Sequence, residues 1–284
     1  MPGLAGKGVQ GQSPETVIDA GQREHGYWRE VWRYRELLYF LARRDIAIRY
    51  RQTVLGIAWV LLRPLLTVVV FTVVFGRLAG FADGTMPYSL VILAGILPWQ
   101  LCASALVDSG NSVVNNGSLI SKVYFPRLII PLSSLLASLV DFFVVFLLYL
   151  LLMIWNGMQF HTQILLLPFY VLLCLATSFG IGLWVASLNV RYRDFRIIAT
   201  VLVQLGLYVS PVGFSSAVIP EKWRLIYSLN PMVGIIDGFR WTLLGDQSSL
   251  YWPGLMAAIA VSFILLVSSI VYFRASEKHF ADEI

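Results

Sequence analysis

Six stretches of the chain are apolar over roughly the length that a helix needs to cross a bilayer, which is about 20 residues. Polar or charged segments separate these stretches and predict the connecting loops. The pattern therefore predicts an all-α membrane protein with six transmembrane helices in one domain over residues 53–275. The expected spans are residues 55–78, 88–112, 129–155, 163–188, 196–214 and 251–273.

The second apolar stretch has the most polar interruptions, namely Pro98, Gln100 and Asp108. They predict a kinked helix or polar groups that face other helices. An acid at mid-span costs about 2.5–3.5 kcal/mol on insertion scales. Asp141 of the third stretch is therefore expected either to pair with a neighbouring helix or to take part in transport.

A basic and aromatic segment, residues 27–52, runs into the first span with no polar loop between them. It predicts an amphipathic helix at the membrane interface, with Trp and Tyr at headgroup depth and Arg toward anionic lipid. Packing against a partner protein is the alternative. Arg35 and Asp45 interrupt its apolar side. Residues 1–26 are rich in Gly, Gln and Ser and predict a disordered cytoplasmic start.

Two connecting segments have patterns of their own. Residues 215–250, between spans five and six, are apolar only in patches and rich in Pro and Gly. They predict two short re-entrant helices on the outer side, with a plain periplasmic loop as the alternative. Residues 113–128 predict a short amphipathic helix from Ser118 to Tyr124, ended by Pro126, or an ordinary loop. Residues 276–284 are expected to form a cytoplasmic tail.

Composition agrees with a membrane protein. Hydrophobic residues make up 58% of the chain, charged residues only 13%, and the mean hydropathy is +0.74. Soluble domains have about 45–50% apolar and about 25% charged residues. The net charge of +5 lies beside apolar runs, which indicates membrane orientation and not nucleic-acid binding. With both termini cytoplasmic, inner segments hold sixteen Lys and Arg and outer loops four, as the positive-inside rule requires.

The sequence lacks the motifs of common enzyme sites. It has no G-x-x-x-x-G-K-[ST] loop for ATP and no G-x-S-x-G, and its three histidines lie far apart. Nothing in the sequence therefore calls for a catalytic site, a metal site or a cofactor on this chain. Arg63 lies about seven residues into the first span. It either snorkels to the inner interface or faces a cavity where it meets phosphate.

Several motifs together resemble one family, the ABC-2-type permeases that export polysaccharides such as O-antigen. They occur in order over about residues 30–275, and in combination they are specific. The motifs are RDIAIRYRQTVLGIAWVLLRPLL (44–66), PYSLVILAGILPWQ (87–100), KVYFPRLIIPLSSL (122–135), NVRYRDFR (189–196), SPVGFSS (210–216) and LNPMVGIIDGFRW (229–241).

The resemblance implies a transport subunit, not an enzyme, in the bacterial inner membrane. It implies a homodimer that assembles with two copies of a separate ABC ATPase, which binds ATP and Mg²⁺, and exports a lipid-linked glycan from the cytoplasmic side. Coupling to the ATPase is expected through the amino-terminal region and the 115–128 loop, with Lys122, Tyr124, Phe125, Pro126 and Arg127. An aromatic-lined channel is expected from Trp59, Phe71, Phe75, Tyr88, Trp99, Tyr208 and Phe214.

A polyprenyl-diphosphate head would seek the basic inner interface, so Arg49, Arg51 and Arg63 are the candidates to receive it at a gate formed by the amphipathic helix. Within the same class, export of teichoic acid, capsule or a drug is the alternative. A secondary transporter is less favoured, because such proteins use inverted repeats and buried coupling acids. The sequence shows no internal repeat and only isolated acids.

Overall fold

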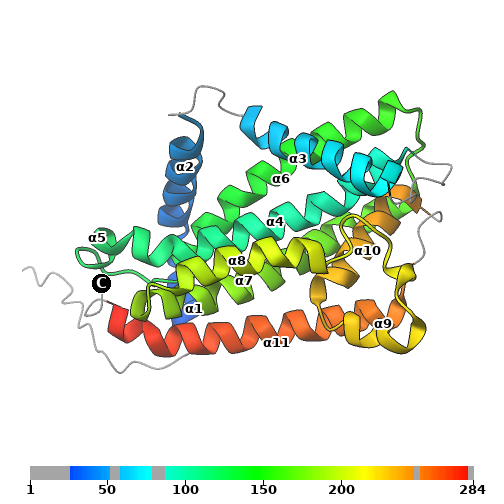
Figure 1. The fold of residues 1–284 in the computed structure, drawn as a ribbon. Helices are drawn as coiled ribbons and strands as arrows, with labels where there is room; N and C mark the ends of the chain where they lie inside the picture. The colour runs from blue at the N-terminus through cyan, green and yellow to red at the C-terminus, as the bar shows by residue number, and fades with distance from the viewer. Residues whose placement is uncertain (1–25, 52–57, 79–86, 246–249, 281–284) are drawn as a thin grey trace, which may run out of the picture.

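The computed structural model describes residues 26–51, 58–78, 87–245 and 250–280. Every secondary-structure element within these ranges is a helix (Figure 1). The elements are α1 (Tyr27–Arg33), α2 (Arg35–Arg51), α3 (Ala58–Phe71), η1 (Thr72–Leu78), α4 (Tyr88–Asn115), α5 (Gly117–Ile120), α6 (Ile129–Trp155), η2 (Thr162–Leu166), α7 (Leu167–Arg191), α8 (Phe195–Val209), η3 (Ser216–Val218), α9 (Glu221–Tyr227), α10 (Pro231–Leu244), α11 (Trp252–Ser276) and η5 (Glu277–His279).

Within the described residues, four helices are long and apolar enough to cross a membrane: α4, α6, α7 together with η2, and α11. They confirm four of the predicted helices, those at 88–112, 129–155, 163–188 and 251–273. Figure 1 shows α4, α7 and α11 running alongside one another through the length of the molecule. The predicted and observed bounds of α6 coincide.

The helix with the most polar interruptions, α4, is the one that protein covers best. Its most apolar window is 72% buried, against 33% in α6 and 28% in α11. The helix continues through Pro98, and the Cys174 thiol of α7 donates to the Pro98 carbonyl. Ser109 and Ser112 are buried and donate to carbonyls of their own helix. Polar groups that lipid could not satisfy thus lie at the centre of the bundle.

The other two predicted spans correspond to shorter apolar helices, Ala58–Val74 and Phe195–Val209. The start of the first predicted span, residues 55–57, lies outside the described residues. The fifth was predicted to run to Phe214, but α8 ends five residues earlier. A proline disfavours helical geometry in the residue before it, and Ser210, which precedes Pro211, is extended with φ −87° and ψ 151°.

The segment between α8 and α11 contains the short helices α9 and α10, and their predicted re-entry from the outer side stays a prediction. Twelve of the 14 residues of α10 are buried. The Asn230 side chain caps its first turn by accepting from the Met232 amide, and Gly245 ends it with φ 70°. Figure 1 shows α10 beside the ends of the long helices. Protein therefore covers α10, whereas α9 has no buried residue.

The amino-terminal segment forms two helices with a break at Tyr34, where ψ is 21°. Figure 1 shows α2 running across the direction of the long helices instead of along it. The predicted apolar arc of this segment includes Trp32, Tyr39 and Ala42; Ala42 is buried, whereas Trp32 and Tyr39 are exposed. Only part of that arc therefore packs against the rest of the chain.

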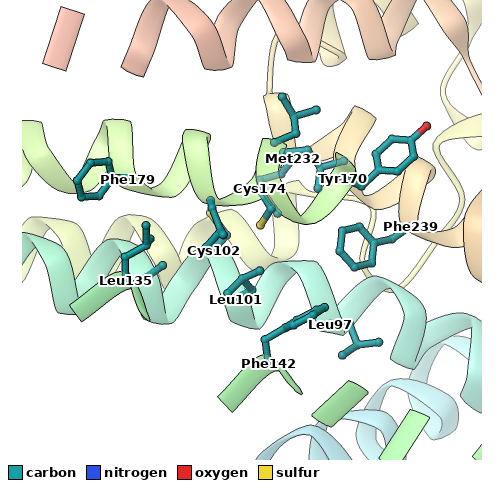
Figure 2. Close-up of a cluster of buried hydrophobic side chains, with 14 of the residues drawn as sticks. Leu97, Leu101, Cys102, Leu135, Phe142, Tyr170, Cys174, Phe179, Met232 and Phe239 are labelled. Atoms are coloured by element: carbon teal, nitrogen blue, oxygen red, sulfur yellow. The ribbon is translucent and has the colours of Figure 1, made fainter. Parts of the chain in front are cut away.

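The core lies between α4, α6, α7 and α10 (Figure 2). Phe239 of α10 meets both Phe142 of α6 and Tyr170 of α7, with ring centroids 6.1 and 6.5 Å apart. Cys102 and Cys174, both buried free thiols, lie in the same cluster. Aromatic contacts of this kind hold α10 against the long helices.

Close helix packing gives a direct test of this arrangement. A Cβ at Gly180 of α7 would lie 3.0 Å from backbone atoms of Leu265 and Leu266 in α11. We expect Gly180→Val to lower the free energy of unfolding by about 1–3 kcal/mol, because helix backbones must separate. Gly26→Ala, where nothing lies within 4 Å, is the control. Equal thermal midpoints for the two variants in detergent would contradict this packing.

Candidate functional site

One arginine of α2 connects the two isolated acids of the long helices. Nη2 of Arg49 lies 2.5 Å from Oδ2 of Asp108 in α4, and Nη1 binds Oδ2 of Asp141 in α6. The three side chains are 20–32% exposed. The structural alternative considered for Asp141, pairing with a neighbouring helix, is thus the one that the structure shows.

Two neutral donors complete what we call the Arg49 cluster, formed by Arg49, Tyr50, Asp108, Ser138 and Asp141. The Tyr50 hydroxyl donates to Asp141, and Oγ of Ser138 donates to Asp108 over 3.1 Å. Burial, and then the Asp141 carboxylate, raise the pKa of the Tyr50 phenol, so it remains a donor. Two carboxylates and one guanidinium leave a formal charge of −1, which these hydroxyls help to stabilise.

A second set of polar contacts lies about one turn earlier on α2, four to five residues before Arg49. Arg44 pairs with Asp45 at 2.8 Å and donates to the Asn116 side chain at 2.7 Å. Oγ of Ser133 in α6 donates to Asp45 over 3.3 Å. Asp45, which interrupts the apolar side of the predicted helix, therefore faces α6 of the same chain. The other interruption, Arg35, lies over the Trp32 ring at 5.7 Å.

The three arginines predicted to receive a diphosphate have different surroundings. Arg49 is bound by two carboxylates, whereas Arg51 and Arg63 are exposed. Arg49 is therefore already occupied by acids of the same chain, whereas the other two guanidinium groups face the surface. Arg51 ends α2, and Arg63 lies in the second turn of α3 just before Pro64.

The predicted channel aromatics fall into two groups. Four lie near the end of α8. The Tyr88 hydroxyl donates to the carbonyl of Gly213 next to Phe214, and Trp99 packs against Gly206, two residues before Tyr208. Tyr208 is 70% exposed. In the first predicted span, Trp59 is exposed and Phe71 is buried against the core, while the side chain of Phe75 lies outside the description.

A buried arginine from the segment predicted to lie on the outer side, residues 215–250, holds the backbone after α8. Arg240 of α10 is 4% exposed and donates to the carbonyls of Val212 and Phe214, both at 2.7 Å. One turn earlier, Asp237 accepts from Oγ of Ser216 at 2.5 Å. The signal available in the sequence was an acid and a base three residues apart inside an apolar run, which places them on one helix face.

The predicted coupling loop has an exposed part and an anchored part. Lys122 and Tyr124 are exposed, the latter by 66%, whereas Phe125 and Pro126 are buried. Partial desolvation of the Tyr124 hydroxyl, and then the nearby Glu30 carboxylate, raise the pKa of this phenol. The helix before the loop, α5, has only four residues and ends at Ile120, so the predicted helix through Tyr124 is too long.

The chain end contributes to the same region. Residues 276–284 were predicted as a tail, but Phe280 is buried and Glu277 accepts from the backbone N–H of Arg127. Phe280 also lines an open pocket of about 500 Å³ together with residues of α4, α5 and the following turn. The other lining residues are Val114, Asn115, Gly117, Ser118, Ile120 and Ser121.

Comparison with known proteins finds one family of transporters and several transport proteins as relatives. Residues 36–244 match the family described as ABC-2 type transporter. An O-antigen export system permease protein of Myxococcus xanthus is 28% identical over 258 residues, which cover 90% of this chain and 98% of that protein. One from Klebsiella pneumoniae is 26% identical, with 87% and 94% covered. A polysialic acid transport protein of Escherichia coli is 22% identical, with 68% and 76% covered.

The Arg49 cluster predicts a stability defect with a specific rescue. Arg49→Met leaves two carboxylates without their cation, and we expect it to lower the free energy of unfolding by about 1–3 kcal/mol in these partly exposed surroundings. Adding Asp108→Asn and Asp141→Asn should restore part of the loss, because the uncompensated charges are then gone. Thermal unfolding of the purified protein measures both effects.

The matched control is Arg51→Met, which removes an exposed arginine from the same helix and should leave stability nearly unchanged. A loss as large as that of Arg49→Met would contradict the assignment. So would a triple variant that is less stable than Arg49→Met alone.

Proposed function

We propose, on the premise that this chain belongs to the ABC-2 type transporter family, that it is the permease subunit of an O-antigen exporter. It would move a lipid-linked polysaccharide from the cytoplasmic to the periplasmic side of the bacterial inner membrane. The observation that carries the proposal is end-to-end similarity to an O-antigen export permease, over 98% of that protein's length. Four helices able to span a membrane support it.

We propose six spans per subunit, with both termini cytoplasmic and α9 and α10 re-entrant from the outer side. In this arrangement α3 with η1, and α8, form the first and fifth spans. At 1.5 Å per residue the 15 residues of α8 extend about 22 Å, less than the 30 Å of a hydrocarbon core. A second copy of the chain, in a homodimer, would cover the exposed apolar side of such a short helix.

Energy would come from two copies of an ABC ATPase, which bind ATP and Mg²⁺ on their own chains. The docking surface we propose is the exposed part of the 122–127 loop, with Lys122 and Tyr124 available for contact. Phe125 and Pro126 are buried and would transmit the contact to the bundle. The α1–α2 segment lies on the same cytoplasmic side and would form the rest of the coupling region.

The diphosphate of the lipid carrier would bind Arg51 and Arg63. Both guanidinium groups are exposed, and arginine binds phosphate oxygens in a bidentate manner. Arg49 would act differently, by holding α2 in place as a gate helix through Asp108 and Asp141. The exported glycan would then pass Trp59 and the four aromatics near the end of α8, whose flat faces suit sugar rings.

Capsule export is the alternative with a relative behind it, the polysialic acid transport protein. That match is 22% identical and covers 68% of this chain, against 28% and 90% for the first O-antigen permease. Teichoic acid or drug export, and secondary transport, have no comparable support.

Deletion of the gene tests the proposed function. We expect lipid-linked glycan to accumulate on the cytoplasmic side and surface O-antigen to disappear, and plasmid-borne wild-type chain to restore both. Glycan analysis of the surface polymer, together with the lipid-linked pool, is the measurement. Normal surface O-antigen in the deletion strain would refute the proposal, and loss of capsule alone would favour the alternative.

The two exposed arginines give a finer test. Arg51→Ala with Arg63→Ala should reduce export about tenfold or more, since each charged hydrogen bond to phosphate contributes about 1.5–3 kcal/mol. Arg43→Ala, an exposed arginine earlier on α2, is the matched control. Binding of a radiolabelled polyprenyl diphosphate to purified permease should fall in parallel. Unchanged binding in the double variant would exclude these residues.

A further inference from the structure

One carboxylate near the end of the described chain joins three segments that are far apart in sequence. Oε1 of Glu277 accepts from the backbone N–H of Arg127 at 2.7 Å, and Oε2 accepts from the Tyr27 hydroxyl at 3.0 Å. Glu277 follows directly after α11, Arg127 lies in the loop before α6, and Tyr27 begins α1. The two bonds span 150 and 250 residues of sequence.

The same three segments contact each other through further groups. The Arg127 guanidinium donates to the backbone carbonyl of Glu277, so these two residues bind each other twice. The guanidinium of Arg274, one turn earlier on α11, lies over the Tyr27 ring at 4.4 Å. We call this set, Tyr27, Arg127, Arg274 and Glu277, the Glu277 junction.

Apolar side chains surround the junction. Phe125 of the loop, Phe273 of α11 and Phe280 are 4% exposed or less, and the rings of Phe273 and Phe280 pack edge to face at 5.3 Å. Burial, and then the Glu277 carboxylate, raise the pKa of the Tyr27 phenol, which keeps it a donor. Charged hydrogen bonds are stronger in such surroundings than in water.

The position of the junction suggests a task beyond holding the chain end in place. Residues 122–124 are exposed, and directly after them the chain is fixed by buried Phe125 and Pro126 and by Glu277. From the junction, α11 runs along α7 to α10, and α1 continues into α2. These contacts connect the loop both to the cross-running α2 and to the far end of the bundle.

We propose that Glu277 is a positioning residue for energy coupling, which binds the 122–127 loop rigidly to α1 and α11. The role rests on the proposed function, because it takes the loop to be the contact with the partner ATPase. Glu277 touches neither ATP nor glycan. It fixes the geometry through which loop movement is transmitted.

The first experiment uses the permease assembled with its ATPase in lipid nanodiscs, and export in cells. We expect Glu277→Ala to reduce export about tenfold or more, as loss of charged hydrogen bonds would, while the complex still assembles and hydrolyses ATP. Glu277→Gln should recover most of the export, because its amide oxygen still accepts from Arg127. Glu221→Ala, an exposed glutamate of α9, is the control and should export normally.

A milder variant covers the case in which Glu277→Ala fails to fold. Tyr27→Phe removes one hydrogen bond and keeps the ring under Arg274, so it should reduce export partially. Combined with Glu277→Gln, it should reduce export by less than the sum of the two single effects, because both act on one interaction. Wild-type export by both Glu277→Ala and Tyr27→Phe would overturn the proposal. So would a loss of export fully explained by lost assembly.

A second experiment needs only the permease. Spin labels at Trp28→Cys and Tyr124→Cys, both exposed positions, report the distance between α1 and the loop. We expect one narrow distribution in the wild-type background and a broad one with Glu277→Ala. A narrow distribution in both refutes the junction's role, whatever the substrate. If the distribution is narrow in the wild-type background and broad with Glu277→Ala, but the wild-type chain exports no O-antigen, only the proposed function is refuted and the role of the junction stands.

Discussion

The binding of Arg49 to Asp108 and Asp141 determines how the amino-terminal half of the molecule is arranged. Two acids on apolar helices would be costly in lipid. One guanidinium from α2 binds both, and the hydroxyls of Tyr50 and Ser138 help to stabilise the negative charge that remains. Because the acids belong to α4 and α6, this cation can be placed only where those two helices meet. The cluster therefore fixes α2 across the bundle.

The same physical solution recurs at two other places. Arg240 is buried and holds the segment after α8 through backbone carbonyls, and Glu277 holds the loop before α6 through a backbone N–H. At both of these places a charged side chain on a helix forms hydrogen bonds with backbone groups of a non-helical segment. The long helices pack through apolar and small residues, whereas the segments between them are positioned by charge.

Hydropathy alone predicted the four long apolar helices that the structure describes, α4, α6, α7 and α11. Both ends of α6 were predicted because an apolar run has a physical length to cover. Pro211 indicated that α8 ends early, because a proline disfavours helical geometry in the residue before it. The predicted span nevertheless ran to Phe214, because apolar residues follow the proline. The partners of Arg49 were beyond reach, because 92 residues separate it from Asp141 and pairing depends on how helices pack. Glu277 was missed because a short charged end resembles a solvated tail.

The different surroundings of Arg49 and Arg51 follow from helix geometry. Residues two apart on an α-helix point about 200° from each other, so when Arg49 faces α4 and α6, Arg51 must face away from them. Releasing Arg49 to bind a phosphate would leave two carboxylates unpaired, whereas Arg51 already faces away from that cluster. Two arginines that look equivalent in sequence are therefore suited to different tasks, one to hold the helix and the other to meet an anion.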